Sequence, residues 1–401
     1  MVSKESLAHA SRVDEAVRRP SFAAQRLADE RLQQSWRRSL ESYRLDPGRT
    51  AEPRILTNDK LRDHLESLES FLRIARHGVK KLHEQMREAN YVVLLTDATG
   101  DTIDFAGLPS LDKELKHAGL YLGACWSEDE EGTCGVGTAI VDQLPIKVHK
   151  KEHFRAPNIS LTCSASPVFD PEGRLLAILD ASALYSPDDR KSQNLVLQFV
   201  NQSAAMIENA FFLERFRGAW VLQLSSSREF LEVQTDYLFA FDEHGIVLAA
   251  NRRAQSEMAL CARAGSHLEE LFEASSGELI RRGLTSNLVF PLRAVTGATF
   301  YSRLRVPESE TPAHPRVNPA PASRGHAARF VPLQSFAGAD SSMRTNVHRA
   351  AHILNARIPY VVPGRDRHRQ RGVCQDYTPV QRSSRQAVCS AQLRRHSCHA
   401  D

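Results

Sequence analysis

Apolar residues recur along the chain with two periods, one typical of helices and one typical of strands. Within residues 61–82 they return every three or four positions, as on one face of an amphipathic helix. Residues 35–43 share this pattern and end at a Pro-Gly turn, and residues 188–216 form a further long amphipathic run. The pattern predicts a helical N-terminal region at 1–88 and a connecting helix, suited to dimerisation, at 188–224.

Between these helices, short β-branched and apolar runs predict an antiparallel sheet. A hairpin is expected at 91–105 and a strand at 145–149, followed by strands at 161–169 and 175–183 that a turn at 170–173 connects. A Gly-rich polar loop at 126–137 leads into a short helix, and a second polar loop follows at about 150–160. Polar loops at one end of a small sheet are typical of a small-molecule pocket.

A second, smaller module is predicted at 225–306. It has short helices at 230–233 and 268–272, strands at 237–241 and 246–250, and a hairpin at 287–306, with Asn251 as the cap of a helix through Met258. From residue 307 the chain becomes rich in Pro, Ala, Ser and Arg, which predicts a flexible linker at 307–335 before a helix at 342–355. The expected fold class is α+β.

Composition and charge add little to this picture. The 401 residues predict two or three domains, and 42% hydrophobic and 25% charged residues are ordinary for a globular protein. We expect a cytoplasmic protein without membrane contact, since no apolar run approaches about 18–20 residues and the N-terminus lacks a secretory signal. Residues 360–401 contain eight Arg, three Asp and no Lys or Glu, a net charge of +5, so the rest of the chain carries −1 of the overall +4.

The sequence shows no combination of residues typical of an enzyme, a cofactor site or a metal site. The cysteines lack CxxC spacing, which argues against disulfides and structural zinc, and no nucleophile with a base and an orienting group is evident. The residues that we expect to line the pocket are Trp126, Ser127, Thr133, Cys134, His153, Thr162, Ser164 and Asp180.

Several of these residues have a plain structural alternative. Cys134 is either a reactive thiol at a helix N-terminus or a small residue in a tight loop. Trp126 either lines the pocket or closes the core. Asp180 follows an apolar strand and either reaches a ligand or caps a backbone group, and the acidic run at 128–131 is expected to be a solvated loop face.

Three segments resemble the GAF sensor domain of acetoin-catabolism-type activators, which are sigma-54-dependent, Fis-type bacterial transcription regulators. They read WSEDEEGTCGVGTAI, KKEHF and LTCSASPVFDPEGRLLAILDAS. Upstream, SWRRSLESYRLDP resembles the N-terminal helix of that family, and TDYLFAFDEHGIVLAANRRA resembles the start of a PAS domain. The resemblance implies a GAF domain at 89–187 and a PAS-like domain at 225–306.

The resemblance also implies a function as the sensory half of such a regulator. It implies an acetoin-like small-molecule effector and a homodimer, whereas contact with DNA and RNA polymerase is expected only of intact relatives. The alternative is a stand-alone GAF/PAS interaction module that forms a heterodimer with an intact regulator. An enzyme is the least favoured hypothesis.

In the family an AAA+ ATPase and a helix-turn-helix should follow, and residues 336–359 resemble only the ATPase start. Where the P-loop is expected, the chain reads GRDRHRQR. A choice of codons for these residues, read one nucleotide later, encodes Glu-Thr-Gly-Thr-Gly-Lys-Glu, which is similar to the family P-loop. We therefore expect a single-nucleotide frameshift near residues 358–361, a disordered out-of-frame tail at 360–401, and no ATPase activity.

Overall fold

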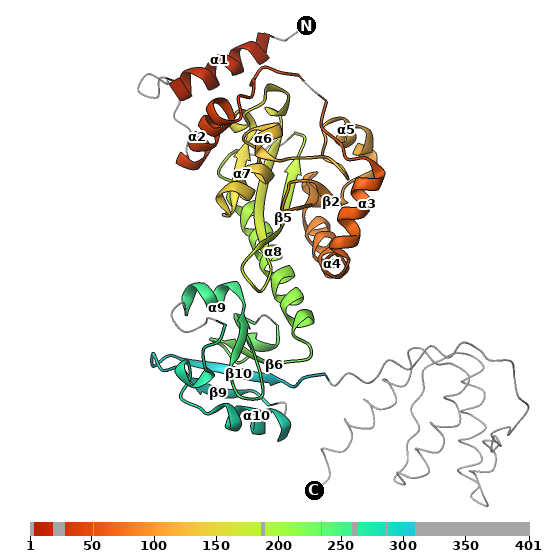
Figure 1. Cartoon of the computed structure of the whole chain (residues 1–401). Coiled ribbons are helices and arrows are strands. Elements are labelled where there is room, and N and C mark those ends of the chain that lie inside the picture. Colours follow the sequence, from red (N-terminus) through yellow and green to blue (C-terminus); the bar gives the residue numbers. More distant parts are fainter. Residues whose placement is uncertain are drawn as a thin grey trace, which may run out of the picture. The chain divides into compact units, whose positions relative to one another are not determined.

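The computed structural model describes residues 4–18, 29–50, 52–185, 189–233, 235–258, 264–285 and 288–308. The expected linker at 307–335 lies almost entirely outside the described residues. The helix at 342–355 and the expected frameshifted tail lie entirely outside them, so these three remain predictions. Within the described part the chain forms two five-stranded antiparallel sheets flanked by helices, and Figure 1 follows it from α1 in red to β10 in cyan. The expected α+β class is confirmed.

The first sheet has the strand order β2-β1-β5-β4-β3. Its strands are β1 (Val92–Asp97), β2 (Thr102–Ala106), β3 (Ile146–His149), β4 (Thr162–Phe169) and β5 (Leu175–Ala183). All neighbours pair antiparallel, and β4 and β5 are joined by the predicted turn, in which the Asp170 carboxylate accepts from the backbone N–H groups of Glu172 and Arg174.

Helices precede and cover this sheet. They are α1 (Lys4–Arg18), α2 (Glu30–Arg37), which continues as a π-helical turn at Arg38–Ser42, α3 (Asn58–Ser67), α4 (Glu69–Met86), α5 (Asp112–His117), α6 (Glu128–Glu131), α7 (Gly135–Asp142) and α8 (Gln193–Arg215). The predicted single helix at 61–82 is wrong in one respect. The backbone leaves helical geometry at Leu68, with φ −112° and ψ 12°, and divides it into α3 and α4.

The two faces of the first sheet carry separate apolar clusters. Val93 and Leu95 of β1 pack with α4 and α8, whereas Val92 and Leu94 pack with α7 and its neighbours. Successive side chains of a strand point to opposite faces, so a continuous apolar run such as residues 91–95 is what a sheet covered on both faces requires. Every residue of β1 is accordingly buried.

The second sheet has the order β8-β7-β6-β10-β9. Its strands are β6 (Trp220–Ser225), β7 (Tyr237–Phe241), β8 (Val247–Ala250), β9 (Phe290–Arg293) and β10 (Thr299–Arg305), with the helices α9 (Arg252–Glu257) and α10 (Ser276–Thr285). Asn251 caps α9 as predicted, because its side chain accepts from the backbone N–H of Ala254 at 3.1 Å. Sequence reasoning missed α10, and it assigned the β6 segment to the connecting helix.

Candidate functional site

Two polar side chains of β5 are directed into the face of the first sheet that α7 covers. Asp180 and Ser182 alternate with Leu179 and Ala181, which pack on the opposite face, and they share their own face with Ile178. Asp180 is 1% exposed and Ser182 is fully buried. Such groups are costly to bury unless they find hydrogen-bond partners.

The partners of these two residues form a buried row of polar groups. Asp180 Oδ2 lies 2.5 Å from Ser182 Oγ, which lies 3.0 Å from the Sγ of Cys163 on β4, directly opposite Ser182 in the sheet register. His153 Nε2 is 3.3 Å from the same Sγ, and its Nδ1 is 2.9 Å from the carbonyl oxygen of Lys150. We call Asp180, Ser182, Cys163 and His153 the Asp180 chain.

The direction of these hydrogen bonds follows from the Lys150 carbonyl, which can only accept. His153 Nδ1 therefore carries the hydrogen, and Nε2 of the neutral ring accepts from the Cys163 thiol. Burial lowers the pKa of His153 to about 4, which keeps the ring neutral. Burial likewise raises the pKa of the Cys163 thiol far above its usual value. A neutral thiol beside a neutral imidazole is not an activated nucleophile.

Asp180 has a strongly perturbed pKa. Burial raises its pKa to about 7, against the opposing hydrogen bond from Ser182. Its second oxygen, Oδ1, is buried and has no hydrogen-bond partner. Near neutral pH the group is thus divided between a carboxylic acid, which can donate, and a carboxylate, which accepts.

The first turn of α7 lies against Asp180. A Cβ at Gly135 would be 3.0 Å from Asp180 Oδ1 and 2.7 Å from the Cβ of Cys163, so only glycine permits this approach. Cys134 precedes the helix as its N-cap, and its sulfur accepts from the backbone N–H of Gly137 at 3.3 Å and donates to the carbonyl of Trp126 at 3.3 Å. Burial raises the pKa of Cys134 well above its usual value, so the geometry favours the structural alternative over a reactive thiol.

Three of the predicted pocket residues hold the loop that precedes α7. Trp126 donates through Nε1 to the Gly119 carbonyl and packs in the core on the α7 side, which supports its role in closing the core. Thr133 Oγ1 is 2.6 Å from Ser35 Oγ on α2. Ser127 is the residue before α6, in extended conformation.

The acidic run at 128–131 is only in part the solvated face that the sequence suggested, because Asp129 is exposed but Glu128 and Glu131 are not. Glu128 is 3% exposed, and its carboxylate accepts from Arg38 Nε at 2.8 Å and Nη2 at 3.0 Å. Glu131 is also largely buried and faces Arg155 Nε at 3.6 Å. The expectation failed because the N-terminal helix that covers this loop brings a guanidinium to it, and a bidentate ion pair makes a buried carboxylate tolerable.

The remaining two predicted residues lie on the other face of the sheet. Ser164 is paired with Ala181 and Thr162 with Ala183, so both are directed toward the α8 side, away from Asp180. Thr162 Oγ1 contacts His149 Nδ1 at 3.0 Å, and Ser164 Oγ is buried without a hydrogen-bond partner. The structure therefore brings together Asp180, His153 and Cys134 and separates Thr162 and Ser164 from them. Sequence reasoning missed Ser182 and Cys163, which the alternation of β4 and β5 could have indicated.

Comparison with known proteins identifies relatives of this chain. Residues 16–209 match the family described as MimR, N-terminal domain. The acetoin catabolism regulatory protein of Cupriavidus necator is 40% identical over 357 residues, which cover 86% of this chain and 52% of that protein. The acetoin dehydrogenase operon transcriptional activator AcoR of Bacillus subtilis is 28% identical over 38% of this chain and 25% of that protein. The chain thus spans about half the length of the first relative and a quarter of the second.

Among solved structures, the crystal structure of the E. coli DhaR(N)–DhaL complex matches with a TM-score of 0.42 and 15% identity, over 70% of this chain and 100% of that chain. None of the helices in the described part of the chain has the length and apolar character that a membrane span requires. The resemblance seen in the sequence is confirmed by the match to the Cupriavidus necator protein, which runs through most of the chain. The chain therefore belongs to the family of acetoin-catabolism-type transcriptional regulators.

Proposed function

We propose that this chain is the sensory region of a transcription regulator and that its first sheet binds a small, uncharged, polar effector at the Asp180 chain. The observation that carries the proposal is the buried Oδ1 of Asp180, which has no hydrogen-bond partner and lies at the first turn of α7. A buried acceptor left unpaired costs about 1–3 kcal/mol, which a ligand hydroxyl would recover.

The chemistry of the Asp180 chain suggests the class of effector. A carboxyl group whose pKa burial has raised to about 7 binds hydroxyl groups as an acceptor and carbonyl groups as a donor. The other polar members, Ser182, Cys163 and His153, are neutral, so no cation or anion finds a counter-charge among them. A small hydroxy-ketone fits this set. Acetoin is the first candidate, because the names of two of the matched regulators refer to acetoin.

We further propose that α8 carries the signal onward. The helix packs on the first sheet through Val196, Val200 and Ile207, and Phe212 near its end packs on β6, β7 and β8 of the second sheet. An effector that favours one arrangement of the first sheet would bias the position of this helix. We propose action on promoters, DNA and polymerase only for full-length relatives.

A second candidate function is a stand-alone module that pairs with another regulator. The exposed apolar residues Leu195, Phe199 and Met206 of α8 favour it, since they stand on one face at coiled-coil spacing. We favour a second copy of this chain as the partner, because an identical helix offers the same stripe in an isologous pair. Co-purification with a longer regulator, in place of self-association, would support the heterodimer.

Titration calorimetry with acetoin tests the effector site. In Asp180→Asn the side chain loses its ability to switch between donor and acceptor, and we expect at least about a tenfold loss of affinity, equal to about 1.4 kcal/mol. Asp129→Asn is the matched control, because it makes the same chemical change at an exposed position of the neighbouring loop. Equal affinity in all three proteins would contradict the site, whereas binding of a different hydroxy-ketone that Asp180→Asn abolishes would contradict only acetoin.

A further inference from the structure

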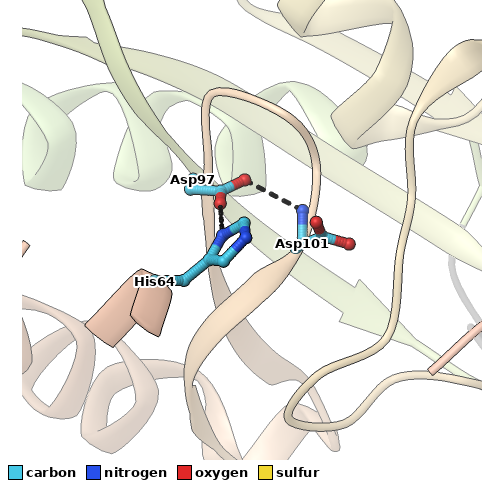
Figure 2. A group of neighbouring side chains, drawn as sticks. All are labelled: His64, Asp97 and Asp101. Carbon is cyan, nitrogen blue, oxygen red and sulfur yellow. Dashed lines mark hydrogen bonds and ion pairs between the residues drawn. The ribbon is translucent and has the colours of Figure 1, made fainter. Parts of the chain in front are cut away.

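A second cluster of ionisable side chains lies at the end of the β1–β2 hairpin, apart from the Asp180 chain. His64 comes from α3, Asp97 ends β1, and Asp101 stands in the turn before β2, as Figure 2 shows. His64 Nδ1 is 2.5 Å from Asp97 Oδ2. One ring nitrogen and one oxygen from each carboxylate all lie within 4.8 Å of one another. We call these three residues the hairpin cluster.

The two carboxylates of the hairpin cluster are unequally satisfied. Asp97 is 6% exposed, and its Oδ1 accepts from the backbone N–H groups of Thr99 and Asp101 and from the Thr99 hydroxyl. Asp101 is 4% exposed, its Oδ2 shares a contact with the same hydroxyl at 3.2 Å, and its Oδ1 has no hydrogen-bond partner. Two negative charges this close repel each other, and a cation bound between them would offset that repulsion.

The neighbouring guanidinium of Arg54 does not fully neutralise these carboxylates. Arg54 Nη2 is 4.0 Å from Asp101 Oδ1, at the limit of an ion pair, and Arg54 Nη1 is hydrogen-bonded to Glu130 at 2.8 Å. The guanidinium is therefore shared with the acidic loop, and its side chain is half exposed. The buried oxygen of Asp101 is left to another partner.

We propose that the hairpin cluster binds a divalent transition-metal cation through His64, Asp97 and Asp101. Imidazole together with carboxylate oxygens suits Zn²⁺, Mn²⁺ and Fe²⁺, and water would complete the coordination. Sequence reasoning expected no metal. The three residues are 33 and 4 positions apart and show none of the compact spacing by which metal sites are usually recognised.

A metal here would bind α3 to the hairpin and act on the loop before α7. The hairpin turn contacts that loop directly, since the Trp126 N–H donates to the Gly100 carbonyl at 2.9 Å. A Cβ at Gly100 would lie 2.8 Å from the backbone nitrogen of Ser127, so the two segments are in close contact. Occupancy of the hairpin cluster is therefore expected to stiffen the loop that leads to the Asp180 chain.

The test uses the full chain without an affinity tag, freed of metal and titrated with ZnCl₂ and with MnCl₂. We expect one ion per chain and an affinity that falls at least about tenfold in Asp101→Asn and in His64→Gln. Asp63→Asn is the control, because Asp63 is an exposed neighbour of His64 on α3. Circular dichroism of each variant checks that it is folded.

The Arg54→Gln variant tests the site without removing any of the three proposed metal-binding side chains. If the hairpin cluster binds a metal cation, loss of the neighbouring positive charge in Arg54→Gln tightens metal binding. If the cluster is only an ion-pair network, Arg54→Gln lowers the thermal stability of the protein and does not raise its affinity for metal. The proposal is overturned if neither ion binds, if the ligand variants bind as tightly as Asp63→Asn, or if Arg54→Gln leaves the affinity unchanged or lower.

Discussion

The carboxyl group of Asp180 lies in the middle of a sheet and is buried on all sides. Ser182 satisfies one oxygen and the backbone of Gly135 lies close to the other, so the site depends on two small residues around one acid. A buried carboxyl of this kind costs folding free energy, and proteins keep such groups chiefly where they bind or react. Asp180 and its polar neighbours are thus as deeply buried as the apolar core residues, but they carry ionisable and hydrogen-bonding groups.

The raised pKa of Asp180 predicts how stability depends on pH. The folded pKa of about 7 lies above the ordinary value of 3.8, so between these values the folded state binds more protons than the unfolded state. Its contribution to the free energy of unfolding therefore falls by roughly 1.4 kcal/mol per pH unit as the pH rises through this window. Denaturant titrations at pH 5.5 and 8 should show Asp180→Asn gaining stability relative to wild type at pH 8.

Glu208 has the same direction of shift, because burial raises its pKa to about 7 as well. Only the difference between wild type and Asp180→Asn therefore isolates Asp180. His153 acts in the opposite direction. Burial lowers its pKa to about 4, and its contribution is lost as the pH falls below the unfolded value of 6.5. A constant difference between the two proteins at both pH values would contradict the assignment.

Gly135 yields a prediction about packing. A methyl group there would be 2.7 Å from the Cβ of Cys163, closer than side chains tolerate, so Gly135→Ala should cost about 1–3 kcal/mol. Gly277→Ala is the control, since its Cβ would meet nothing within 4 Å in α10 and should be neutral or slightly stabilising. Denaturant unfolding of both variants measures the effect, and equal stability would show that α7 can move away from β4.

At the scale of elements, the strands behave as their residue patterns indicate. β4 and β5 keep an unbroken alternation over most of their length, and this alternation separates Ser164 from Asp180. The helices are less regular. A single amphipathic pattern became α3 and α4, and α3 contains no buried residue among the ten that form it. The spacing of apolar residues thus predicts which face of a helix is buried better than it predicts whether the helix is unbroken.

The exposed stripe of α8 predicts self-association. Leu195, Phe199 and Met206 are 67%, 47% and 40% exposed, which is unusual for residues of this size on one helix face. Phe199→Glu places a charge in that stripe and should convert a dimer to a monomer without unfolding the first sheet. Light scattering coupled to size-exclusion chromatography measures this. Lys191→Glu, at an exposed polar position before the helix, is the control, and a wild-type monomer would contradict the prediction.

At the scale of the whole described molecule, α8 belongs to two cores. Ile207 packs with the first sheet and Phe212 with the second, and the side-chain amide of Asn251, before α9, donates to Asn209 of α8 at 2.9 Å. A shift of this helix would therefore change side-chain packing against both sheets. This is the physical basis for assigning it the transfer of a signal between the effector site and whatever follows the second sheet.

Much of the fold could be predicted from the residues. The strands of the first sheet, the turn at 170–173 and the cap at Asn251 each follow from local patterns or from side-chain chemistry. The misses have physical reasons. The break at Leu68 depends on how α3 and α4 pack, and β6 resembles the end of an apolar helix until its pairing with β7 and β10 is known.

Local residue patterns were enough to predict the fold class and the polar loops beside a small sheet, because periodicity and turn chemistry are properties of neighbouring residues, and the resemblance of three segments was enough to predict the family. The contacts between polar groups, by contrast, became known from the three-dimensional structure. It joined Asp180, through Ser182, to Cys163 and His153, paired Glu128 with Arg38, and brought His64 to Asp97 and Asp101. These contacts connect residues far apart in the chain, and their cost or benefit depends on burial, which no local pattern records.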